Sequence, residues 1–308
     1  MSSKTPLVSV GLPAYNEEKY IRKTILSLLE QTYNNLEIII SDNASTDSTV
    51  KLIKETVTND ARCKIVVQKE NIGVVENFRF VRNSATGDYF MWLGGHDILD
   101  KGFIERAVNF LRINKDYVLF YPKAIYMDIN NNKIELTENP IETSSENPRE
   151  RACFVFQTLN VGTPIHGLFN SEFIKKMPLN DHGCDDMLIL YLAAIEGKIK
   201  VTDSFDYIRN KYRIETEEEI EKRYSSYGYK THLKGFNLSN LIGLYHLLFT
   251  LKSSHLSNTD KFTIMKLIIR KYYFINLSTY SKFCLSVEKR FDYFLQGLFF
   301  FLLKRFQR

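Results

Sequence analysis

An imidazole and a carboxylate stand next to each other where an apolar run ends. His96 and Asp97 follow two glycines, Gly94 and Gly95, and the apolar run occupies residues 89–93. A run of this composition is typical of a buried strand, and α/β proteins bind ligands in the crevice beyond the carboxyl ends of their strands. Imidazole and carboxylate groups are common ligands of divalent cations. The segment therefore predicts a binding site in which His96 and Asp97 hold a metal ion.

Two earlier apolar runs, residues 7–12 and 36–41, also end in residues that suit a ligand. Tyr15 and Glu17 follow the first run, and Asp42 follows the second. A nucleotide needs an aromatic or apolar wall for its base and acceptors for the base N–H groups and the ribose hydroxyls. We therefore expect these three residues to contact a nucleotide. For Asp42, a purely structural role in the turn is the alternative.

Two acidic residues open a predicted helix further along the chain. Asp185 and Asp186 begin residues 185–196, an apolar segment of helical length. Carboxylates at a helix N-terminus can stabilise the helix through its dipole. A carboxylate can also accept a proton from a reacting hydroxyl as a general base. The residues alone leave both roles open.

The elements that must position these residues alternate between strand and helix. Apolar runs predict strands over residues 7–12, 36–41, 64–68, 89–93, 117–126, 165–170, 198–202 and 205–213. Apolar residues at helical spacing predict helices over residues 17–31, 45–59, 74–84, 101–114, 150–159 and 185–196. This alternation predicts a parallel sheet with helices on both faces. The polar residues that follow parallel strands are then expected to share one crevice.

The order of the motifs resembles that of the family 2 glycosyltransferases, which have the GT-A fold. The matching segments are Pro-Ala-Tyr-Asn-Glu-Glu at 13–18, Ser-Asp-Asn-x-Ser-Thr-Asp at 41–47, Asn-x-Gly at 71–73 and Arg-Asn-x-x-x-Gly-x-Tyr at 82–89. The resemblance spans roughly residues 5–215. It implies an α/β, Rossmann-like fold with a mostly parallel sheet. It also implies transfer of a sugar, usually with inversion, from a nucleotide-diphosphate donor (a UDP-sugar is favoured) to a hydroxyl of a glycan or lipid-linked acceptor, in the synthesis of bacterial surface polysaccharide.

The same resemblance assigns roles to individual residues. It makes Asp186 the catalytic base, with Asp185 as the other member of the acidic pair. The Asp-x-Asp metal motif of the family falls on Gly94-Gly95-His96, so the first acid is missing and an imidazole replaces the second. Because imidazole suits Mn²⁺ better than Mg²⁺, we expect a Mn²⁺ site formed by His96 and Asp97. The alternative is a metal-independent site in which Lys or Arg stabilises the leaving phosphate. The donor site is expected to comprise Pro13, Ala14, Tyr15, Glu17, Asp42, Asn71, Arg82, Gly95, His96 and Arg213.

Two other classes of function are weighed against this one. A non-catalytic relative that binds nucleotide sugars or glycans would also account for an altered metal motif. A nucleotidyltransferase would have a similar crevice, but the first predicted strand is not followed by a Gly-rich phosphate loop that carries Lys or Arg. Transfer or donor hydrolysis that depends on Mn²⁺ would separate the enzyme from the binding protein.

The charge of the chain is uneven along its length. Residues 1–215 have a net charge of −3, whereas residues 216–308 have a net charge of +8. We therefore predict a catalytic domain over residues 1–215 and a helical, basic and aromatic region over residues 216–308. The last segment, 287–308, suits peripheral contact with an anionic membrane surface, or a homo-oligomer interface. Its basic residues alternate with aliphatic ones, which argues against nucleic acid as a partner.

Cysteine spacing and hydropathy indicate a cytoplasmic setting. The cysteines, at positions 63, 153, 184 and 284, form no CxxC pair, which argues against a zinc cage or a disulfide framework. The N-terminus does not resemble a secretory signal, and no segment reaches the roughly 20 apolar residues needed to span a bilayer. We expect a cytoplasmic protein that lies at the inner face of the cytoplasmic membrane if its tail binds lipid.

Overall fold

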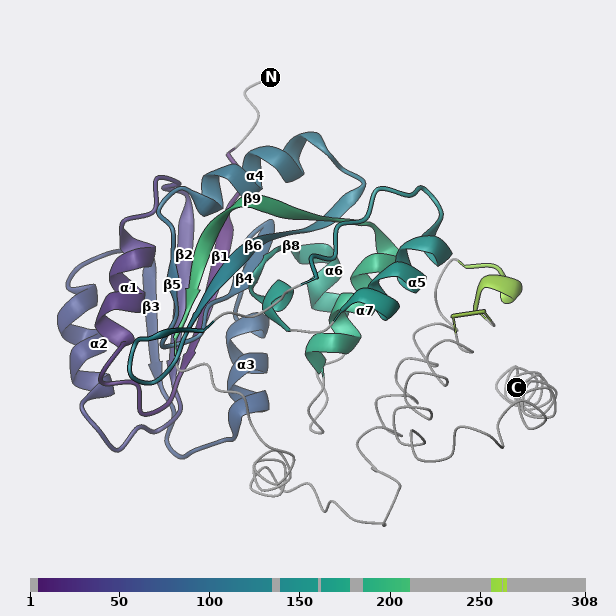
Figure 1. Ribbon diagram of the computed structural model, residues 1–308. Coiled ribbons are helices and arrows are strands. Elements are labelled where there is room, and N and C mark those ends of the chain that lie inside the picture. Colours follow the sequence, from purple (N-terminus) through teal and green to yellow (C-terminus); the bar gives the residue numbers. More distant parts are fainter. Residues whose placement is uncertain are drawn as a thin grey trace, which may run out of the picture.

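Among the residues that the structure describes, nine strands form one mixed sheet in the computed structural model (Figure 1). The structure describes residues 5–134, 139–159, 162–177, 185–210, 256–261 and 263–264. The strand order is β3-β2-β1-β4-β8-β6-β9-β5, and β7 pairs with β6. Arg213 and nearly all of the predicted region 216–308 lie outside the described residues.

The first half of the sheet follows the predicted alternation of strand and helix. Its strands are β1 (Val8–Ala14), β2 (Leu36–Asp42), β3 (Cys63–Val67) and β4 (Tyr89–Trp92), and its helices are α1 (Ile21–Leu29), α2 (Thr49–Val57) and α3 (Val74–Asn83). The pairings β1–β2, β1–β4 and β2–β3 are all parallel. The carboxyl ends of these strands therefore meet at one edge. Pro13 does not end the first strand, because β1 continues to Ala14, which is in register with Asp42.

The second half departs from simple alternation. In chain order its elements are β5 (Ile98–Leu99), α4 (Phe103–Ile113), β6 (Tyr117–Met127), β7 (Lys133–Ile134), α5 (Pro148–Thr158), the 3₁₀-helix η1 (Thr163–His166), β8 (Leu168–Asn170), α6 (Ser171–Lys176), α7 (Asp185–Glu196) and β9 (Lys198–Arg209). β8 is antiparallel to both of its neighbours, and β5 is antiparallel to β9. The expectation of parallel alternation throughout was wrong here, because strands of two or three residues are too short to show a period.

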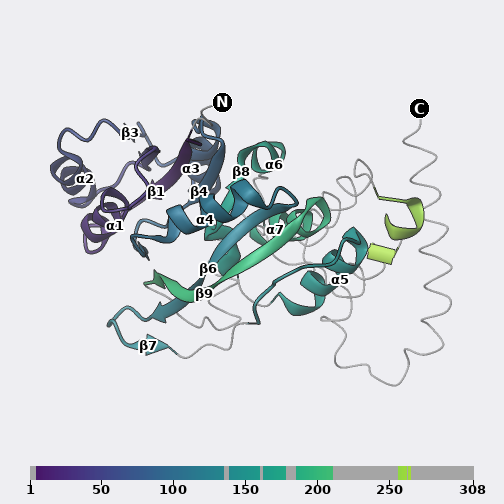
Figure 2. The ribbon, with the colours of Figure 1, turned by 90° about the horizontal axis from the view of Figure 1, so that it is seen from above.

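Three predicted strands have different extents in the structure. Residues 198–209 form one continuous strand rather than two. This strand pairs in parallel with β6, and the pairing register shifts where a polar stretch forms a β-bulge. Figure 2 shows β6 and β9 running side by side, with β7 at their tip. The predicted strand at 165–170 begins instead with the turn η1, and only its last three residues pair as β8.

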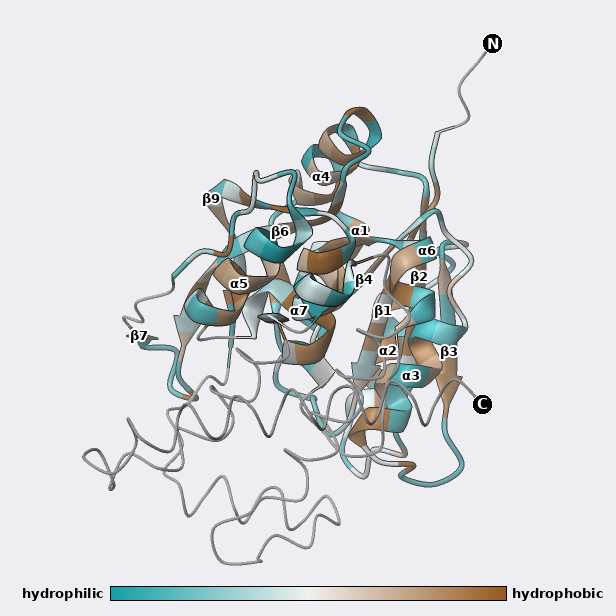
Figure 3. Cartoon of the chain, turned by 90° about the vertical axis from the view of Figure 1, so that its right-hand side faces the viewer, coloured by the Kyte–Doolittle hydropathy of each residue, from teal (hydrophilic) through white to brown (hydrophobic). Residues whose placement is uncertain are grey.

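Side chains alternate between two hydrophobic cores, one on each face of the sheet. In β2, Ile38 and Ile40 pack with α1, α2 and α4, whereas Ile39 packs in the core that contains residues of α3, α5, α6 and α7. β4 shows the same alternation, with Met91 on the first face and Trp92 on the second. Hydrophobic residues accordingly dominate the central strands in Figure 3, while α3 shows both kinds of residue. A sheet packed on both faces holds its strand ends rigidly at the edge where the site lies.

A short described part of the C-terminal region packs on this domain. Ile264 is 1% exposed and belongs to the core that contains α5 and α7. Arg149 of α5 also approaches Asp260, with Nη1 3.5 Å from Oδ1. Within the part of the chain that the structure describes, no helix combines the length and apolar character that crossing a membrane requires.

Candidate active site

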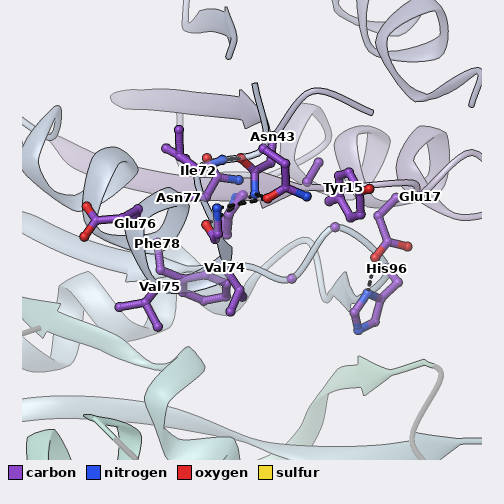
Figure 4. A pocket seen from close by; sticks show the side chains of 16 residues that line it. Tyr15, Glu17, Asn43, Ile72, Val74, Val75, Glu76, Asn77, Phe78 and His96 are labelled. Carbon is purple, nitrogen blue, oxygen red and sulfur yellow. Dashed lines mark hydrogen bonds and ion pairs between the residues drawn. The ribbon is translucent and has the colours of Figure 1, made fainter. Parts of the chain in front are cut away.

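A cavity of about 790 Å³ opens at the carboxyl ends of β1, β2 and β4, beside the first turns of α3 (Figure 4). This volume lies in the range of small-molecule ligand sites. Tyr15, Glu17 and His96 lie together at one end of the cavity, while Glu76 and Phe78 of α3 lie toward the other. The lining residues are Pro13, Ala14, Tyr15, Glu17, Asn43, Asn71, Ile72, Gly73, Val74, Val75, Glu76, Asn77, Phe78, Gly94, Gly95 and His96.

The loops after β1 and β2 are fixed by hydrogen bonds within and between them. The Asp42 carboxylate accepts hydrogen bonds from the Ser45 N–H at 2.9 Å and the Ser45 hydroxyl at 2.5 Å. Asp47, in the loop after β2, connects this loop to the loop after β1, because its carboxylate accepts a hydrogen bond from the Glu18 N–H at 3.2 Å. Ala44 adopts a left-handed φ of 58°, a conformation that is costly for a residue with a Cβ. The fully buried Asp42 is thus turned into its own loop rather than toward the cavity.

Two asparagines shape the wall between β2 and α3. Asn43 Nδ2 donates to Asn71 Oδ1 at 2.9 Å and to the Gly73 carbonyl at 3.2 Å. Asn43 Oδ1 accepts at 2.9 Å from the N–H of the residue that precedes Gly73. Asn77 of α3 exchanges two hydrogen bonds with Ser41 at the end of β2. The wall is therefore set before any ligand arrives.

Glu17 orients His96 across the polar end of the cavity. The His96 Nδ1 lies 2.9 Å from Glu17 Oε1 (Figure 4). The other ring nitrogen, Nε2, lies 3.9 Å from Asp97 Oδ1. A carboxylate on one ring nitrogen is how proteins commonly orient an imidazole whose second nitrogen binds a metal.

The two glycines before His96 are required by close contacts. A Cβ on Gly95 would lie 3.0 Å from Cγ of Glu17, and a Cβ on Gly94 would lie 2.6 Å from Oδ2 of Asp97. An aspartate at position 94, the first acid of the Asp-x-Asp motif, would therefore displace the Asp97 carboxylate. The absence of an acid at position 94 therefore allows the Asp97 carboxylate to take its observed position.

Asp97 faces the interior rather than the cavity. It is 1% exposed, and its carboxylate accepts hydrogen bonds from the Tyr207 hydroxyl at 2.6 Å and the Asn210 N–H at 3.0 Å. Desolvation raises the pKa of Asp97, and the neighbouring His96 and these hydrogen bonds only partly offset that increase. Asp97 ties the turn after β4 to β9.

The described residues contain no convergence of three His, Cys, Asp or Glu side chains that would hold a metal ion. The donors near the end of β4 are His96 Nε2 and, behind it, Asp97 Oδ1. Cations that act on nucleotides take much of their coordination from phosphate oxygens and water. The residues present therefore fit a cation shared with a diphosphate better than one held by the protein alone.

A second polar cluster lies at the ends of β6 and β9 and in η1. Arg209 ends β9 opposite Tyr126 of β6, and its Nη1 donates to Thr163 Oγ1 at 3.5 Å. Asp186 Oδ2 lies 3.4 Å from the position that a Cβ on Gly162 would take. The Asp186 side chain is exposed, but nearby protein desolvates its carboxylate. Desolvation raises the pKa of Asp186, and the charge of Arg209 opposes that shift. A carboxyl group with a raised pKa suits general-base chemistry.

His166 packs beside this cluster as a neutral ring. Its ring stacks on Tyr207 with the centroids 5.2 Å apart, and its Nδ1 lies 3.3 Å from the Trp92 carbonyl. Burial lowers the pKa of His166 to about 3, and the positive charge of Arg209 acts in the same direction. His166 therefore serves packing rather than proton transfer near neutral pH.

The structure brings most of the predicted donor residues to one cavity. Those that line it are Pro13, Ala14, Tyr15, Glu17, Asn71, Gly95 and His96. Of the others, Asp42 lies in its turn, and Arg82 donates from Nη1 to the Met177 carbonyl at 2.6 Å, at the end of α6. Arg213 and the side chain of Asp185 lie outside the described residues. Their predicted roles therefore stay predictions.

Sequence reasoning missed two residues of this site. Asn43, which fixes the cavity wall, directly follows Asp42 at the end of β2, and that position was the available signal. Arg209 was missed because the late strand was predicted to continue to residue 213, whereas β9 ends at Arg209.

A sequence model of glycosyl transferase family 2 matches residues 9–176, more than half of the chain. The chain belongs to glycosyl transferase family 2. An uncharacterized glycosyltransferase of Haemophilus influenzae is 31% identical to it over 131 residues, which cover 42% of this chain and 52% of that protein. The putative teichuronic acid biosynthesis glycosyltransferase TuaG of Bacillus subtilis is 33% identical over 111 residues, covering 36% of this chain and 44% of TuaG. The chain thus spans about half or less of the length of these curated relatives.

Solved structures share the fold of this family 2 chain at low sequence identity. The crystal structure of S. aureus TarS 1–349 in complex with UDP-GlcNAc superposes with a TM-score of 0.65 at 18% identity, covering 90% of this chain and 76% of that one. Similarity at this level establishes the fold alone. It confirms the predicted α/β architecture of GT-A type.

Proposed function

We propose that this chain transfers a sugar from a nucleotide-diphosphate donor, preferably a UDP-sugar, to a hydroxyl of a glycan or lipid-linked acceptor, with inversion. The observation that carries the proposal is a nucleotide-sized cavity that shares one edge of the sheet with Asp186. Its family supports glycosyl transfer, and TuaG, named for teichuronic acid biosynthesis, supports an acceptor in a bacterial surface polymer. The UDP-GlcNAc complex of TarS supports the donor class.

Asp186 takes the proton of the acceptor in this mechanism. The acceptor hydroxyl oxygen attacks the anomeric carbon from the face opposite the diphosphate, while the Asp186 carboxylate accepts its proton. The bond from the anomeric carbon to the diphosphate oxygen breaks, and the nucleoside diphosphate leaves with the electron pair. A positioned base contributes about 10²–10⁴-fold to such a reaction.

His96 would hold a divalent cation, with Asp97 behind it. When bound, the cation would neutralise the charge that grows on the leaving diphosphate. Glu17 holds the His96 ring so that Nε2 is available for this role. Mn²⁺ is favoured over Mg²⁺ because imidazole is a better ligand for Mn²⁺.

A thermal-shift screen tests the donor and the metal together. UDP-GlcNAc, UDP-glucose and GDP-mannose are added with and without Mn²⁺, and the unfolding midpoint is measured. A donor at 100 times its Kd stabilises the fold by about 2.7 kcal/mol. We expect a UDP-sugar to raise the midpoint and Mn²⁺ to increase that rise. His96→Ala should abolish the Mn²⁺ increment, whereas the control Lys200→Ala, on β9, should retain it.

The outcomes of the screen separate the alternatives. If no nucleotide sugar changes the midpoint, the donor assignment is wrong. If a donor binds but no UDP is released with glycan or lipid-linked acceptors, the non-catalytic binding function takes its place. A donor increment that is the same with and without Mn²⁺ would remove His96 from a metal site.

The partner of the basic tail is a separate part of the proposal. Residues 287–308 are proposed to hold the protein peripherally at an anionic membrane surface. Flotation with vesicles that contain anionic lipid, comparing the full chain with a form lacking residues 287–308, tests this. Retained binding after the deletion, or a change from dimer to monomer instead, would favour a homo-oligomer interface.

A further inference from the structure

Arg209 is a charged residue to which the proposed mechanism gives no role. It is the last residue of β9, opposite Tyr126 of β6, and it interacts electrostatically with two acids, Asp97 and Asp186. Its Nη1 donates to Thr163 Oγ1 at 3.5 Å. A guanidinium keeps its charge at every working pH and presents its donors in a fixed plane. Arg209 therefore places a permanent positive charge in the polar cluster at the ends of β6 and β9.

The turn at Gly162 and Thr163 brings this charge and Asp186 together. Asp186 Oδ2 lies 3.4 Å from the Cβ position of Gly162, and the hydroxyl of the next residue receives the hydrogen bond from Arg209. Consecutive Cα atoms are about 3.8 Å apart, so the carboxylate and the guanidinium reach adjacent residues of one short turn. The Thr163 hydroxyl also shares a hydrogen bond with the Tyr126 hydroxyl, which holds the turn against β6.

We propose that Arg209 is a positioning residue whose guanidinium, anchored on Thr163, keeps the Asp186 carboxylate ionised so that it can take the proton of the acceptor. The inference rests on the proposed function, because Arg209 acts through Asp186. The Asp186 side chain is exposed, but nearby protein desolvates its carboxylate, and desolvation favours the protonated carboxyl, which cannot serve as a base. A fixed neighbouring cation counters that tendency without occupying the carboxylate as a metal ion would.

Among the charged side chains that the structure describes around this cluster, Arg209 favours ionised Asp186. Desolvation raises the pKa of Asp186, whereas the charge of Arg209 lowers it and a hydrogen bond from the Asp186 backbone lowers it further. Tyr207 and His166 of the cluster are neutral near pH 7, since burial raises the pKa of Tyr207 and lowers that of His166 to about 3. Within the described part of the chain, the titratable and charged groups packed here are Arg209 and Tyr207 on β9, Tyr126 on β6, His166 in η1, and His96 and Asp97 after β4.

The test is a direct titration of Asp186. Protein labelled with ¹³C at the aspartate carboxyl group is titrated by NMR, and the Asp186 resonance is assigned by its loss in Asp186→Asn. We expect Arg209→Gln to raise the Asp186 midpoint by about one pH unit, since an opposite charge nearby shifts a carboxyl by that order. Arg209→Lys, which keeps a cation, should leave the midpoint within about 0.3 units of the wild type.

A matched control and a second variant keep the test decisive. Lys200→Gln removes a different cation from the same strand and should leave the Asp186 midpoint unchanged. If Arg209→Gln does not fold, Thr163→Val removes the hydroxyl that anchors the guanidinium and leaves every charge in place; it should raise the midpoint by a smaller amount. An unchanged midpoint in a folded Arg209→Gln, or in Thr163→Val if that variant is needed, overturns the inference.

Turnover gives a second readout that a merely structural role would not change. In the pH profile of kcat, the acid limb should shift to higher pH in Arg209→Gln and return to its original position in Arg209→Lys. Because the NMR titration needs neither donor nor acceptor, the role of Arg209 and the proposed function are tested independently of each other. A shifted midpoint in a protein that transfers no sugar removes the proposed function, whereas an unshifted midpoint in an active enzyme removes the role of Arg209.

Discussion

The donor cavity, called here the donor end, and the cluster around Asp186, Arg209 and Thr163, called the transfer end, are built by different physical means. At the donor end, the side chains of Asn43 and Asn77 make their hydrogen bonds within the protein, and the loops after β1 and β2 are tied to each other. At the transfer end, Asp186 lies against Gly162 and Arg209 donates to Thr163 of the same turn, beside phenol and imidazole groups. The donor end thus fixes a shape, whereas the transfer end sets a protonation state.

This difference matches what each end has to do. The nucleotide part of a donor is chemically constant, so a rigid wall can recognise it without rearranging. Proton transfer instead depends on the balance between a charge and its surroundings, which one residue can change. Substitutions should therefore alter affinity at the donor end and rate or pH dependence at the transfer end.

The largest effect is expected at the transfer end. Asp186→Asn removes the base but keeps the shape of the side chain, so kcat should fall by about 10²–10⁴-fold. The Kd of the donor, measured by calorimetry, should change by less than about twofold, because Asp186 does not line the donor cavity.

The control for this variant lies at the other end of the same helix. Glu196→Gln, on the exposed surface at the end of α7, should leave kcat unchanged. Asp185→Asn should cost less activity than Asp186→Asn if the base is assigned correctly. A loss of donor affinity as large as the loss of kcat would show that the two ends are not separable.

The donor half also contains a buried carboxylate, but it serves folding. Glu37, near the amino end of β2, accepts hydrogen bonds from Ser9 at 2.5 Å and from Lys64 Nζ at 2.8 Å, and Thr86 donates two more. Desolvation disfavours its charge, but these hydrogen bonds outweigh desolvation and lower the pKa of Glu37 from 4.5 to about 2. The ionised form is therefore bound more tightly in the folded state.

Glu37→Gln should lower the free energy of unfolding by about 2–3 kcal/mol at pH 7. Because the folded-state pKa lies below the unfolded one, the wild-type contribution is present above about pH 5 and is lost as the pH falls toward about 2. Urea unfolding at pH 7 and at pH 3 measures both effects, and the gap between wild type and variant should narrow at the lower pH. Glu55→Gln, in an exposed ion pair with Arg22, should cost much less at either pH. A gap that is equal at both pH values would contradict this account.

Restoring the missing acid should harm the protein rather than improve the site. In Gly94→Asp the new Cβ would meet Asp97 Oδ2 at 2.6 Å, and a second carboxylate would approach the first. We expect a loss of about 1–3 kcal/mol in unfolding free energy and no gain in donor affinity. Thermal unfolding and calorimetry check this, with Gly94→Ala as the variant that separates the steric effect from the charge. Tighter donor binding with Mn²⁺ in Gly94→Asp would show that Asp97 can move out to the cavity.

The last predicted effect concerns the partner of His96. Glu17→Gln keeps a group of the same size but removes the charge that orients the imidazole, so Mn²⁺-dependent donor binding should weaken by about 10–100-fold. Donor binding without metal should change less. Calorimetry in Mn²⁺ and in a chelator measures the two values, and an equal loss in both would place Glu17 on the nucleotide instead of behind His96.

Much of the fold could be predicted from the sequence because its signals are local. The strands β1 to β4 and the helices between them carry long apolar runs and clear helical periods. β5 and β7, with two residues each, and β8, with three, are defined by the strands they pair with rather than by their own composition. The direction of β8 depends on the turn η1, which no apolar pattern encodes.

The site divides in the same way. Residues directly after strands, such as Tyr15 and His96, could be placed at the edge of the sheet from the sequence. The sequence did not show that Asp97 points inward, because that depends on Tyr207, more than a hundred residues away. The link between Arg209 and Asp186 likewise arises from three separate segments that meet only in the folded chain.

The contact between the tail and α5 limits how this chain can be recombined with its relatives. Ile264 fills a place in the core beside α5 and α7, and Asp260 approaches Arg149 on the same helix. α7 also carries Asp186, so a foreign tail that leaves this place empty would loosen the helix behind the base. Exchanging this region between family members should therefore preserve the fold only when α5 is exchanged with it.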